Sequence, residues 1–362
     1  MIPVLHIISD TNIGGGGRSL LSYRMEVAMP RGSALAERVR ALDVPVHELD
    51  ALADRSLDLA ALAPLRRLIR QLEPRLVHTH GALTGRLAGR LEGRRGVYTK
   101  HCAFPPSGPL ATPPGRLLNG LADGLLADGV LAVGPSAREI LKASGIPERR
   151  IHELFNGVPP LPSPTSEQRQ AARAAFGLQP GDFVAGILAR VEEYKGHGTL
   201  LDAAERLAAQ NRPIRLLVAG EGDYLDEVRR RSAALPPGCV VLAGFVQEVE
   251  RALWAMDVQV NASTVSETSS LSLLEGMSMG LPALASGCGG NPSLILHGEN
   301  GLIFPPGDGE ALAGGLARLM DSPEERAAMG RRAKEIFQAR FTGERYAKNI
   351  EKIYLDILKG DQ

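Results

Sequence analysis

Short apolar runs alternate along this chain with longer segments in which apolar residues recur every three or four positions. Runs of about four to eight residues have the length of buried β-strands, and the longer spacing is that of helices with one apolar face. This alternation is typical of α/β proteins whose strands form parallel sheets. We therefore expect an α/β fold with doubly wound sheets.

The alternation occurs twice along the chain. Predicted strands cover residues 3–8, 25–29, 76–79, 97–100, 130–133 and 151–154 in the first half, and 183–189, 214–219, 240–242, 258–261 and 282–286 in the second. Helical spacing covers residues 57–72, 197–211, 224–234, 249–256, 271–279 and 343–358. Since 362 residues also exceed the usual size of one hydrophobic core, two domains are expected.

A proline-rich stretch separates the two halves. Residues 159–166 read PPLPSPTS, which cannot sustain a helix or a central strand. We predict an N-terminal domain at 1–158, a linker at 159–166 and a C-terminal domain at 167–342, with the last helix, 343–358, crossing back to pack on the first domain. Ligands bind at the carboxyl ends of the strands in such sheets, so the cleft between the domains is the predicted ligand site.

Charge and cysteine content narrow the function classes. The net charge is zero, which argues against a nucleic-acid binder, but the first domain is net basic, largely between Arg66 and Lys100. That excess indicates either solvated helix faces or a surface for anionic lipid or a phosphorylated acceptor. Three scattered cysteines without metal-site spacing favour a reduced, cytoplasmic chain. The apolar run at residues 2–8 is too short for a signal peptide or a membrane span.

A glycine-rich turn, with Gly15, Gly16 and Gly17, follows the first predicted strand. Glycines let the backbone approach a ligand, and the following helix start favours an anion, although such turns also serve only to pack a helix on a strand. Ser19 occupies the last glycine position of the dinucleotide fingerprint, and the second strand ends in Met29 and proline rather than an acidic residue. A nicotinamide-dependent enzyme is therefore disfavoured.

Histidines stand at two further strand ends. His80 and His101 lie where an α/β sheet presents ligand-binding groups, although a lone histidine is more often structural. His78, two residues before His80, is expected to face the other way, into packing.

A loop with two cations follows the first strand of the second domain. Arg190 and Lys195 can neutralise a diphosphate without a metal, the arginine through paired hydrogen bonds and the lysine as a point charge. The alternative is an exposed ion pair within the loop, with Glu192 or Glu193.

Two carboxylates eight residues apart give the strongest local signal. Glu267 precedes a predicted helix, where sugar hydroxyls could be met, and Glu275 falls in its second turn, where it can accept hydrogen bonds from a ribose. The backbone N–H groups of Ser269, Ser270 and Leu271 lie at the helix start, ready for phosphate.

In their order along nearly the whole chain, these motifs resemble those of retaining glycosyltransferases of the GT-B group, family 4 (glycosyl transferases group 1). The resemblance also rests on Gly220 in a Gly-Glu-Gly turn and on the segments 156–158, 289–292 and 297–302. It implies two Rossmann-like domains facing across a cleft.

The resemblance also implies roles for the residues. His101, Glu267, Arg190 and Lys195 would be catalytic. The donor would be held by Gly16, Gly17, Arg190, Lys195, Gly220, Glu267, Ser269, Ser270, Leu271 and Glu275, and the acceptor side would include Gly15 and His80. It implies a metal-independent hexosyltransferase with no cofactor, a UDP- or GDP-sugar as the favoured donor, and a glycan or lipid-linked acceptor of polysaccharide or lipopolysaccharide synthesis. A cytoplasmic enzyme peripheral on the inner face of the membrane would fit.

The chain departs from the family pattern at several positions. Ala189 and Thr268 stand where glycine is common, Ser293 stands where glutamate is common, and only residues 18–23 separate the glycine turn from the second strand. These departures leave open a catalytically impaired GT-B partner subunit. A sugar-nucleotide 2-epimerase is the rival enzyme class, which product analysis with the donor alone would distinguish.

Overall fold

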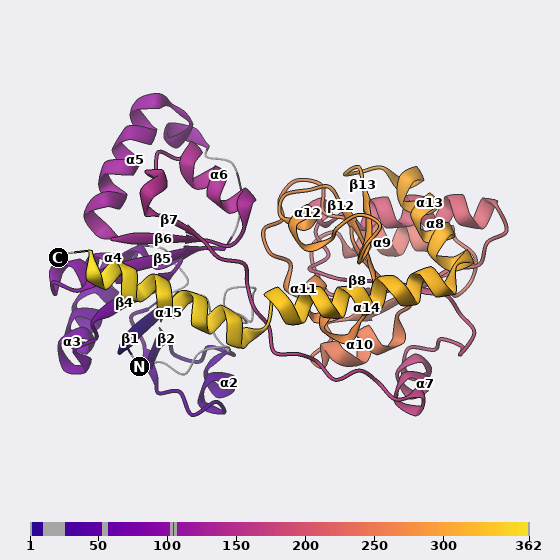
Figure 1. The fold of residues 1–362 in the computed structure, drawn as a ribbon, viewed down its shortest axis with the longest axis horizontal. Helices are drawn as coiled ribbons and strands as arrows, with labels where there is room; N and C mark the ends of the chain where they lie inside the picture. Colours follow the sequence, from indigo (N-terminus) through magenta and orange to yellow (C-terminus); the bar gives the residue numbers. More distant parts are fainter. Residues whose placement is uncertain (1, 10–25, 53–56, 102–103, 105–106, 361–362) are drawn as a thin grey trace. The chain divides into compact units, whose positions relative to one another are not determined.

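The protein is described by a computed structural model that covers residues 2–9, 26–52, 57–101, 104 and 107–360. The chain divides into two compact units, one of residues 1–158 with 343–362 and the other of residues 159–342. Each unit contains one parallel sheet with helices against it (Figure 1). The α/β class expected from the alternating pattern is confirmed.

The first sheet has its strands in the order β3-β2-β1-β4-β5-β6-β7. These strands are β1 Val4–Ile8, β2 Glu26–Pro30, β3 Val46–Leu49, β4 Leu76–His80, β5 Arg95–Lys100, β6 Gly129–Ala132 and β7 Ile151–Glu153. All but β3 were predicted. It lies at the edge of the sheet with every residue only half-buried, so it needs no continuous apolar run and leaves no such signal in the sequence.

Helices cover both faces of this sheet. They are α2 Ala36–Arg40, η1 Leu59–Ala61, α3 Leu62–Leu72, α4 Leu83–Leu91, η2 Gly108–Ala111, α5 Pro113–Leu126, α6 Pro135–Ala143, η3 Glu148–Arg150 and, from the far end of the chain, α15 Gly343–Lys359. Among the residues that the structure describes, no helix combines the length and apolar character needed to span a bilayer.

Helix α15, yellow in Figure 1, completes the core of the first unit. Tyr346, Ile350 and Tyr354 are four residues apart, so they share one helix face, and all three are buried. They pack with Val4 and Leu76 of the two central strands. The last helix in the sequence is therefore part of the unit that contains the first strand.

The second sheet has the order β10-β9-β8-β11-β12-β13. Its strands are β8 Val184–Leu188, β9 Arg215–Ala219, β10 Val240–Gly244, β11 Val258–Asn261, β12 Ala283–Ser286 and β13 Gly301–Phe304. The sequence analysis missed β13, although its Leu302, Ile303 and Phe304 form an apolar run as long as that of the predicted strand 240–242.

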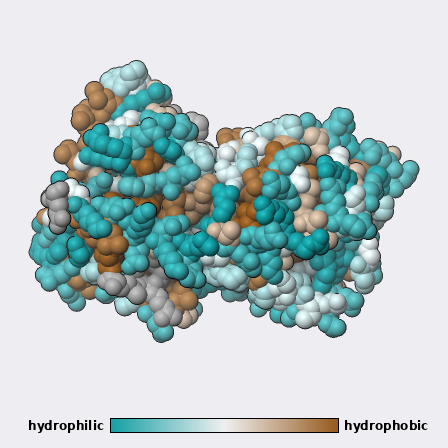
Figure 2. Space-filling view, in the orientation of Figure 1, coloured by the Kyte–Doolittle hydropathy of each residue, from teal (hydrophilic) through white to brown (hydrophobic). Residues whose placement is uncertain are grey.

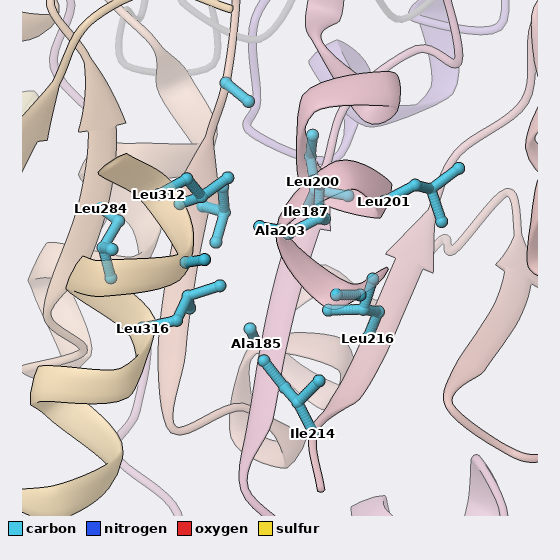
Figure 3. Packing of buried hydrophobic residues seen from close by; sticks show 14 of the residues in the cluster. Ala185, Ile187, Leu200, Leu201, Ala203, Ile214, Leu216, Leu284, Leu312 and Leu316 are labelled. Carbon is cyan, nitrogen blue, oxygen red and sulfur yellow. The ribbon is translucent and has the colours of Figure 1, made fainter. Parts of the chain in front are cut away.

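The helices of the second unit enclose its core. They are α7 Ser166–Ala175, η4 Glu193–Lys195, α8 His197–Ala209, α9 Leu225–Ser232, α10 Val249–Ala255, α11 Leu271–Met279, α12 Asn291–Leu294, α13 Gly309–Asp321 and α14 Pro323–Arg340. Figure 3 shows one side of this core, where Ile187 of β8 lies among Leu200 of α8 and Leu312 and Leu316 of α13. This packing fixes β8, whose end carries the two-cation loop.

The proline-rich stretch lies against the second unit. The Leu161 N–H donates to Ser278 Oγ (3.0 Å), and Trp254 Nε1 donates to the Pro162 carbonyl (2.9 Å). Thr165 caps α7, which begins at Ser166. Residues 159–165 thus pack along the surface of the second unit.

Each sheet has one point at which the strand order reverses. In the first sheet this switch point lies between β1 and β4, and in the second between β8 and β11. Loops that leave neighbouring strands in opposite directions open a crevice at such a point, where α/β proteins bind their ligands. His80 and the two-cation loop come from strands at these points.

Candidate active site

The loop after β8 holds Arg190 and Lys195 in different surroundings. The Arg190 side chain is 69% exposed. Its Nη2 donates to the Tyr194 hydroxyl (2.6 Å), and its Nη1 lies 3.4 Å from Glu192 Oε1. Of the two acidic partners considered from the sequence, Glu192 is the one that this arginine contacts. The guanidinium is therefore accessible to an anion.

Lys195 forms an ion pair across the switch point. Its Nζ donates to Glu267 Oε2 at 3.0 Å, and the two side chains are only 18% and 10% exposed. The same oxygen accepts hydrogen bonds from Ser263 Oγ (2.8 Å) and Asn261 Nδ2 (3.2 Å). A shielded ion pair with additional donors is strongly oriented. The lysine and the first of the two predicted carboxylates are thus brought together.

Glycines support the backbone that carries Glu267. Gly289 has φ of +56°, and a Cβ there would lie 2.1 Å from the Glu267 carbonyl oxygen. A Cβ on Gly290 would lie 1.6 Å from the Thr268 carbonyl oxygen, and the Gly290 N–H donates to the Glu267 carbonyl (3.1 Å). Only glycine allows this close approach. The Gly-Gly pair after β12 therefore allows the backbone of Glu267 and Thr268 to pack directly against it, which fixes the position of this loop.

Helix α11 begins directly after this loop. Ser270 is its N-cap, with Oγ accepting from the Leu273 N–H (3.4 Å) and from Asn261 Nδ2 (3.1 Å). The first N–H groups of a helix have no partner within the helix, and they favour an anion. Ser269 and Leu271 flank the cap, and Glu275 lies in the second turn, 6% exposed.

Gly220, directly after β9, allows its loop to lie close against the loop after β8. Its φ is +148°, and a Cβ there would lie 1.9 Å from the Ala189 carbonyl oxygen. One step further along the two loops, the Val191 N–H donates to the Glu221 carbonyl (2.8 Å). The glycine thus positions the backbone from which Arg190 extends.

In the first unit, three histidines form a hydrogen-bonded row. His80 Nδ1 lies 2.8 Å from His101 Nε2, and His80 Nε2 lies 3.1 Å from His6 Nδ1. The two predicted histidines, His80 and His101, are therefore brought together. His6 was not predicted, because its neighbourhood depends on the pairing of β1 with β4, in which it stands opposite His78.

The expectation that His78 faces away from His80 is wrong. Side chains two residues apart in a strand point to the same face, and the two rings stack with centroids 4.3 Å apart. His78 does lie in packing: its Nδ1 is 2.5 Å from the Tyr354 hydroxyl and its Nε2 is 2.7 Å from Thr99 Oγ1. The histidine therefore ties α15 to the sheet.

Burial keeps these imidazoles neutral. It lowers the pKa of His6 to about 3 and that of His101 to about 4, and it holds the pKa values of His78 and His80 well below the usual one. Ring nitrogens of His6, His78 and His80 lie within 4.8 Å of one another, the one such group found among the described residues. Both nitrogens of His78 contact hydroxyl groups, and both nitrogens of His80 contact other imidazole rings. An ion could therefore bind this trio only by displacing hydrogen bonds.

The predicted glycine turn lies outside the described residues. Gly15, Gly16 and Gly17 fall in the segment 10–25, together with the shortened stretch 18–23. Their proposed contacts with donor or acceptor therefore stay predictions. The same holds for the ligand-binding roles of the residues that the structure does describe.

Sequence models of two families match the chain. Residues 21–160 match Glycosyltransferase Family 4, and residues 182–322 match Glycosyl transferases group 1. Among relatives, EpsD of Bacillus subtilis (strain 168) is 28% identical over 320 residues, which cover 82% of this chain and 80% of EpsD. The alpha-monoglucosyldiacylglycerol synthase of Acholeplasma laidlawii is 29% identical over 202 residues, 54% of this chain and 48% of that protein.

Solved structures share the fold over the whole chain. Alr3699/HepE of Anabaena in complex with UDP superposes with a TM-score of 0.83 at 20% identity, covering 98% of this chain and all of that one. The lipopolysaccharide outer core galactosyltransferase WaaB in its apo form gives 0.65 at 17% identity, with 98% and 99% covered. At sequence identities of 20% and 17%, this likeness concerns only the fold, that is, the arrangement of helices and strands.

Proposed function

Because this chain belongs to the group 1 glycosyltransferases of the GT-B fold, we propose that it transfers a hexose with retention from a nucleotide sugar to a glycan or lipid-linked acceptor. The acceptor belongs to the synthesis of a surface polysaccharide, lipopolysaccharide or glycolipid. Two relatives support this acceptor class by their names, since one is a glycolipid synthase and another an amylovoran biosynthesis glycosyltransferase.

The ion pair of Lys195 with Glu267, beside the start of α11, is the observation that carries this proposal. A donor diphosphate needs positive potential, which the lysine and the helix-start N–H groups supply without a metal ion. The carboxylate beside the lysine can accept hydrogen bonds from the hydroxyls of the sugar. Solved structures of Anabaena HepE with UDP and with UDP-glucose support a nucleotide-sugar donor for this fold.

The chemistry follows from charge. When the bond between the anomeric carbon and the diphosphate breaks, negative charge grows on the leaving phosphate. Groups that already point at this charge lower the barrier, because they need no reorganisation during the reaction. Arg190 is exposed on the loop after β8. Its guanidinium can exchange its contact with Glu192 for paired hydrogen bonds to the phosphate. The oxygen of the acceptor hydroxyl then bonds to the same carbon, and its proton goes to the leaving phosphate, so that a nucleoside diphosphate is released.

A donor screen tests the proposal. UDP-, GDP- and ADP-sugars are added to the protein and its thermal unfolding is followed, because a ligand that binds the folded state raises the melting temperature. We expect one nucleotide class to raise it. The Lys195→Ala variant should lose that shift, whereas Lys348→Ala, which removes an exposed lysine of α15 paired with Glu344, should keep it.

The screen has a clear negative outcome. If no nucleotide sugar stabilises the protein, or if Lys195→Ala responds as strongly as the parent, the donor site is not where we place it. Release of a 2-epimerised sugar from the donor alone would favour the epimerase, and nucleotide binding without any transfer would favour an inactive partner subunit.

We also propose that helix α5 holds the enzyme at an anionic membrane. Its leucines 117, 118, 121 and 125 are 59–67% exposed and lie on one side of the helix, whereas its buried residue is Asp123, paired with Arg86 of α4 (3.2 Å). Figure 2 shows apolar surface on the edge of the first unit where Figure 1 places α5.

Cations accompany these leucines. Arg116 is exposed on α5 itself. Arg150 lies beside the helix, since a Cβ on Gly124 would be 2.4 Å from its Nη1. Arg150, next to Gly124, lies at one edge of the leucine stripe, whereas Arg116 lies on nearly the opposite side of α5. An apolar stripe next to an arginine inserts into the headgroup region of anionic bilayers. This placement suits a lipid-linked acceptor.

A further inference from the structure

Four buried polar side chains form a hydrogen-bonded network behind Glu267. They are Asn261 at the end of β11, Ser263 two residues later, Ser286 at the end of β12 and Asn291 at the start of α12, and none is more than 8% exposed. Strands β11 and β12 are neighbours in the sheet, so their ends lie side by side. Polar groups from separate segments of the chain thus meet beside the carboxylate.

The side-chain amide of Asn261 joins Glu267 to the start of α11. Its Nδ2 donates to Glu267 Oε2 (3.2 Å) and to the Oγ of Ser270 (3.1 Å), which caps the helix. Its Oδ1 accepts from the Ser263 N–H (3.3 Å) and from Asn291 Nδ2 (3.3 Å). The two donor and two acceptor positions of this amide are therefore all used.

Partners with a single role set the direction of the Asn261 amide. An ionised carboxylate only accepts hydrogen bonds, and a backbone N–H only donates them. If the amide turned over, its oxygen would face the Glu267 carboxylate and its NH₂ group would face the Ser263 N–H. Both contacts would then be repulsive. Asn261 therefore has one orientation that satisfies its neighbours, and in that orientation it donates to Glu267.

Asn291 holds this amide in place. Its Nδ2 lies 3.3 Å from Asn261 Oδ1, 3.2 Å from the Ser286 carbonyl oxygen and 3.4 Å from Ser286 Oγ. Ser286 Oγ in turn donates to the Ser263 carbonyl (2.6 Å), and Ser263 Oγ donates to Glu267 Oε2 (2.8 Å). Two routes of hydrogen bonds therefore lead from Asn291 to the carboxylate, one through Asn261 and one through the serines.

Stability alone does not account for Asn291. The residue is 0% exposed, and its Oδ1 has no hydrogen-bond partner among the residues that the structure describes. A buried oxygen without a partner destabilises the folded state. What the asparagine contributes in return is the pair of N–H donors that it directs at Asn261 and Ser286.

We propose that Asn261 and Asn291 are positioning residues that hold the Glu267 carboxylate in the orientation in which it pairs with Lys195. The inference rests on the proposed function for the role of Glu267 at the transferred sugar. The orientation itself is a property of the free protein, in which Lys195 Nζ and Asn261 Nδ2 donate to the same carboxylate oxygen. A carboxylate that can turn about its side-chain bonds is less often in place when the sugar reacts.

Carbon NMR of the free protein tests the orientation without substrate. Glutamates are labelled at the carboxyl carbon, whose chemical shift responds to hydrogen bonds, and the Glu267 signal is assigned by its loss in Glu267→Gln. We expect this signal to move in Asn261→Ala and to move less, in the same direction, in Asn291→Ala. Asn300→Ala is the matched control, because Asn300 is also 0% exposed but its amide bonds backbone groups of its own loop. It should leave the signal in place.

A double-mutant cycle of transfer rates gives the second measurement. Each single variant should lower kcat on the order of tenfold with a smaller change in KM, as expected for residues of one hydrogen-bond network. If Asn291 acts mainly through Asn261, Asn291→Ala should lower kcat only about threefold or less once Asn261 is already alanine. Asn300→Ala should leave kcat unchanged.

Conservative variants guard against a loss of folding. Asn291→Ser restores one donor and should recover part of the lost kcat and part of the Glu267 signal position. If Asn261→Ala does not fold, Asn261→Ser takes its place in both measurements, with smaller changes expected.

Two results would overturn the inference. One is a Glu267 signal that stays in place in both asparagine variants or moves as far in Asn300→Ala. The other is a double variant whose loss of kcat is the product of the two single losses, as for residues that act separately. A parent protein that transfers no sugar would remove the proposed function, and the NMR measurement would still decide the orientation.

Discussion

At the scale of single residues, Glu267 and Glu275 are eight positions apart but differ in surroundings. Glu267 shares its Oε2 among a lysine, a serine and an asparagine, whereas Glu275 is buried in the second turn of α11. The first is thus oriented next to a cation at the proposed reacting centre. The second is buried, and the proposed function assigns it to the ribose of the donor.

Separate effects are expected from their removal. Glu275→Ala should weaken nucleotide binding by about 10- to 100-fold, since hydrogen bonds to a charged group contribute about 1.5–3 kcal/mol. Glu267→Ala should leave nucleotide binding nearly intact and slow transfer by about 100-fold or more. Calorimetric titration and initial rates measure the two effects. Equal losses of binding in both variants would contradict this division of roles.

The buried histidines predict a pH dependence of stability. In the unfolded chain a histidine titrates near pH 6.5, whereas in the folded protein the pKa of His6 is about 3 and that of His101 about 4. Between these values the unfolded state binds more protons. The free energy of unfolding should therefore be fully present above pH 6.5 and fall as the pH decreases towards 4.

Melting temperatures measured from pH 7.5 to 4.5 check this expectation. Most carboxylates titrate below this window, so the slope reports the histidines. His6→Phe, which removes one titrating ring, should show a shallower slope than the parent. A melting temperature that is flat from pH 7 to 5 would mean that these rings are not buried in the folded protein.

At the scale of elements, the alternating pattern was sufficient to locate most strands, but it did not show which strands lie next to each other in the sheets. The two missed strands, β3 and β13, both lie at sheet edges. Strand β3 is half-buried throughout and lacks an apolar run, whereas β13 has one that was overlooked. The cation loop after β8 and the acidic segment after β11 were predicted separately. Their contact through Lys195 and Glu267 depends on the strand order β8-β11, which the sequence does not display.

The same limit applies to the histidines. His80 ends β4 and His101 follows the adjacent strand β5, so both could be predicted from their positions. His6 joins the row through the register of β1 against β4. The mistake over His78 has a different origin, because the period of a strand already places residues 78 and 80 on one face.

Helix α5 gives a prediction at this scale. A Leu117→Gln, Leu121→Gln double variant should reduce co-sedimentation with vesicles containing phosphatidylglycerol by at least about tenfold, since each leucine that leaves water contributes about 1.5–3 kcal/mol. Leu59→Gln is the control, because Leu59 is 68% exposed but lies in η1.

Salt separates the two contributions. High salt should weaken the binding of the parent protein by screening its arginines, while the leucine variants should bind weakly at any salt. Absence of binding by the parent to anionic vesicles at low salt would refute the membrane proposal without touching the donor site.

At the scale of the whole molecule, the two units differ in how the chain builds them. The second unit is one continuous segment, residues 159–342, whereas the first needs residues 1–158 and 343–362 together. Without α15, the sheet face around Val4, Leu76, Val97 and Leu131 loses its cover of Tyr346, Ile350 and Tyr354. Exposed apolar surface of this extent is not stable in a folded unit.

Fragments should therefore behave unequally. We expect the fragment 159–342 to fold alone with a cooperative thermal transition, and the fragment 1–158 to be unfolded or aggregated until a peptide of residues 343–362 is added. Circular dichroism and gel filtration measure both. A cooperatively folded fragment 1–158 would show that α15 is dispensable for the first unit.

The path of α15 also has a consequence for biosynthesis. A ribosome makes the amino-terminal part first, at about 5–20 residues per second, and domains usually fold in that order. Here the segment made first must wait for the final helix to emerge, while the later, continuous unit can already be complete. A nascent chain stalled before residue 343 would thus contain a folded second unit and a first unit that still lacks α15. At this stage the exposed core of the first unit would need chaperones.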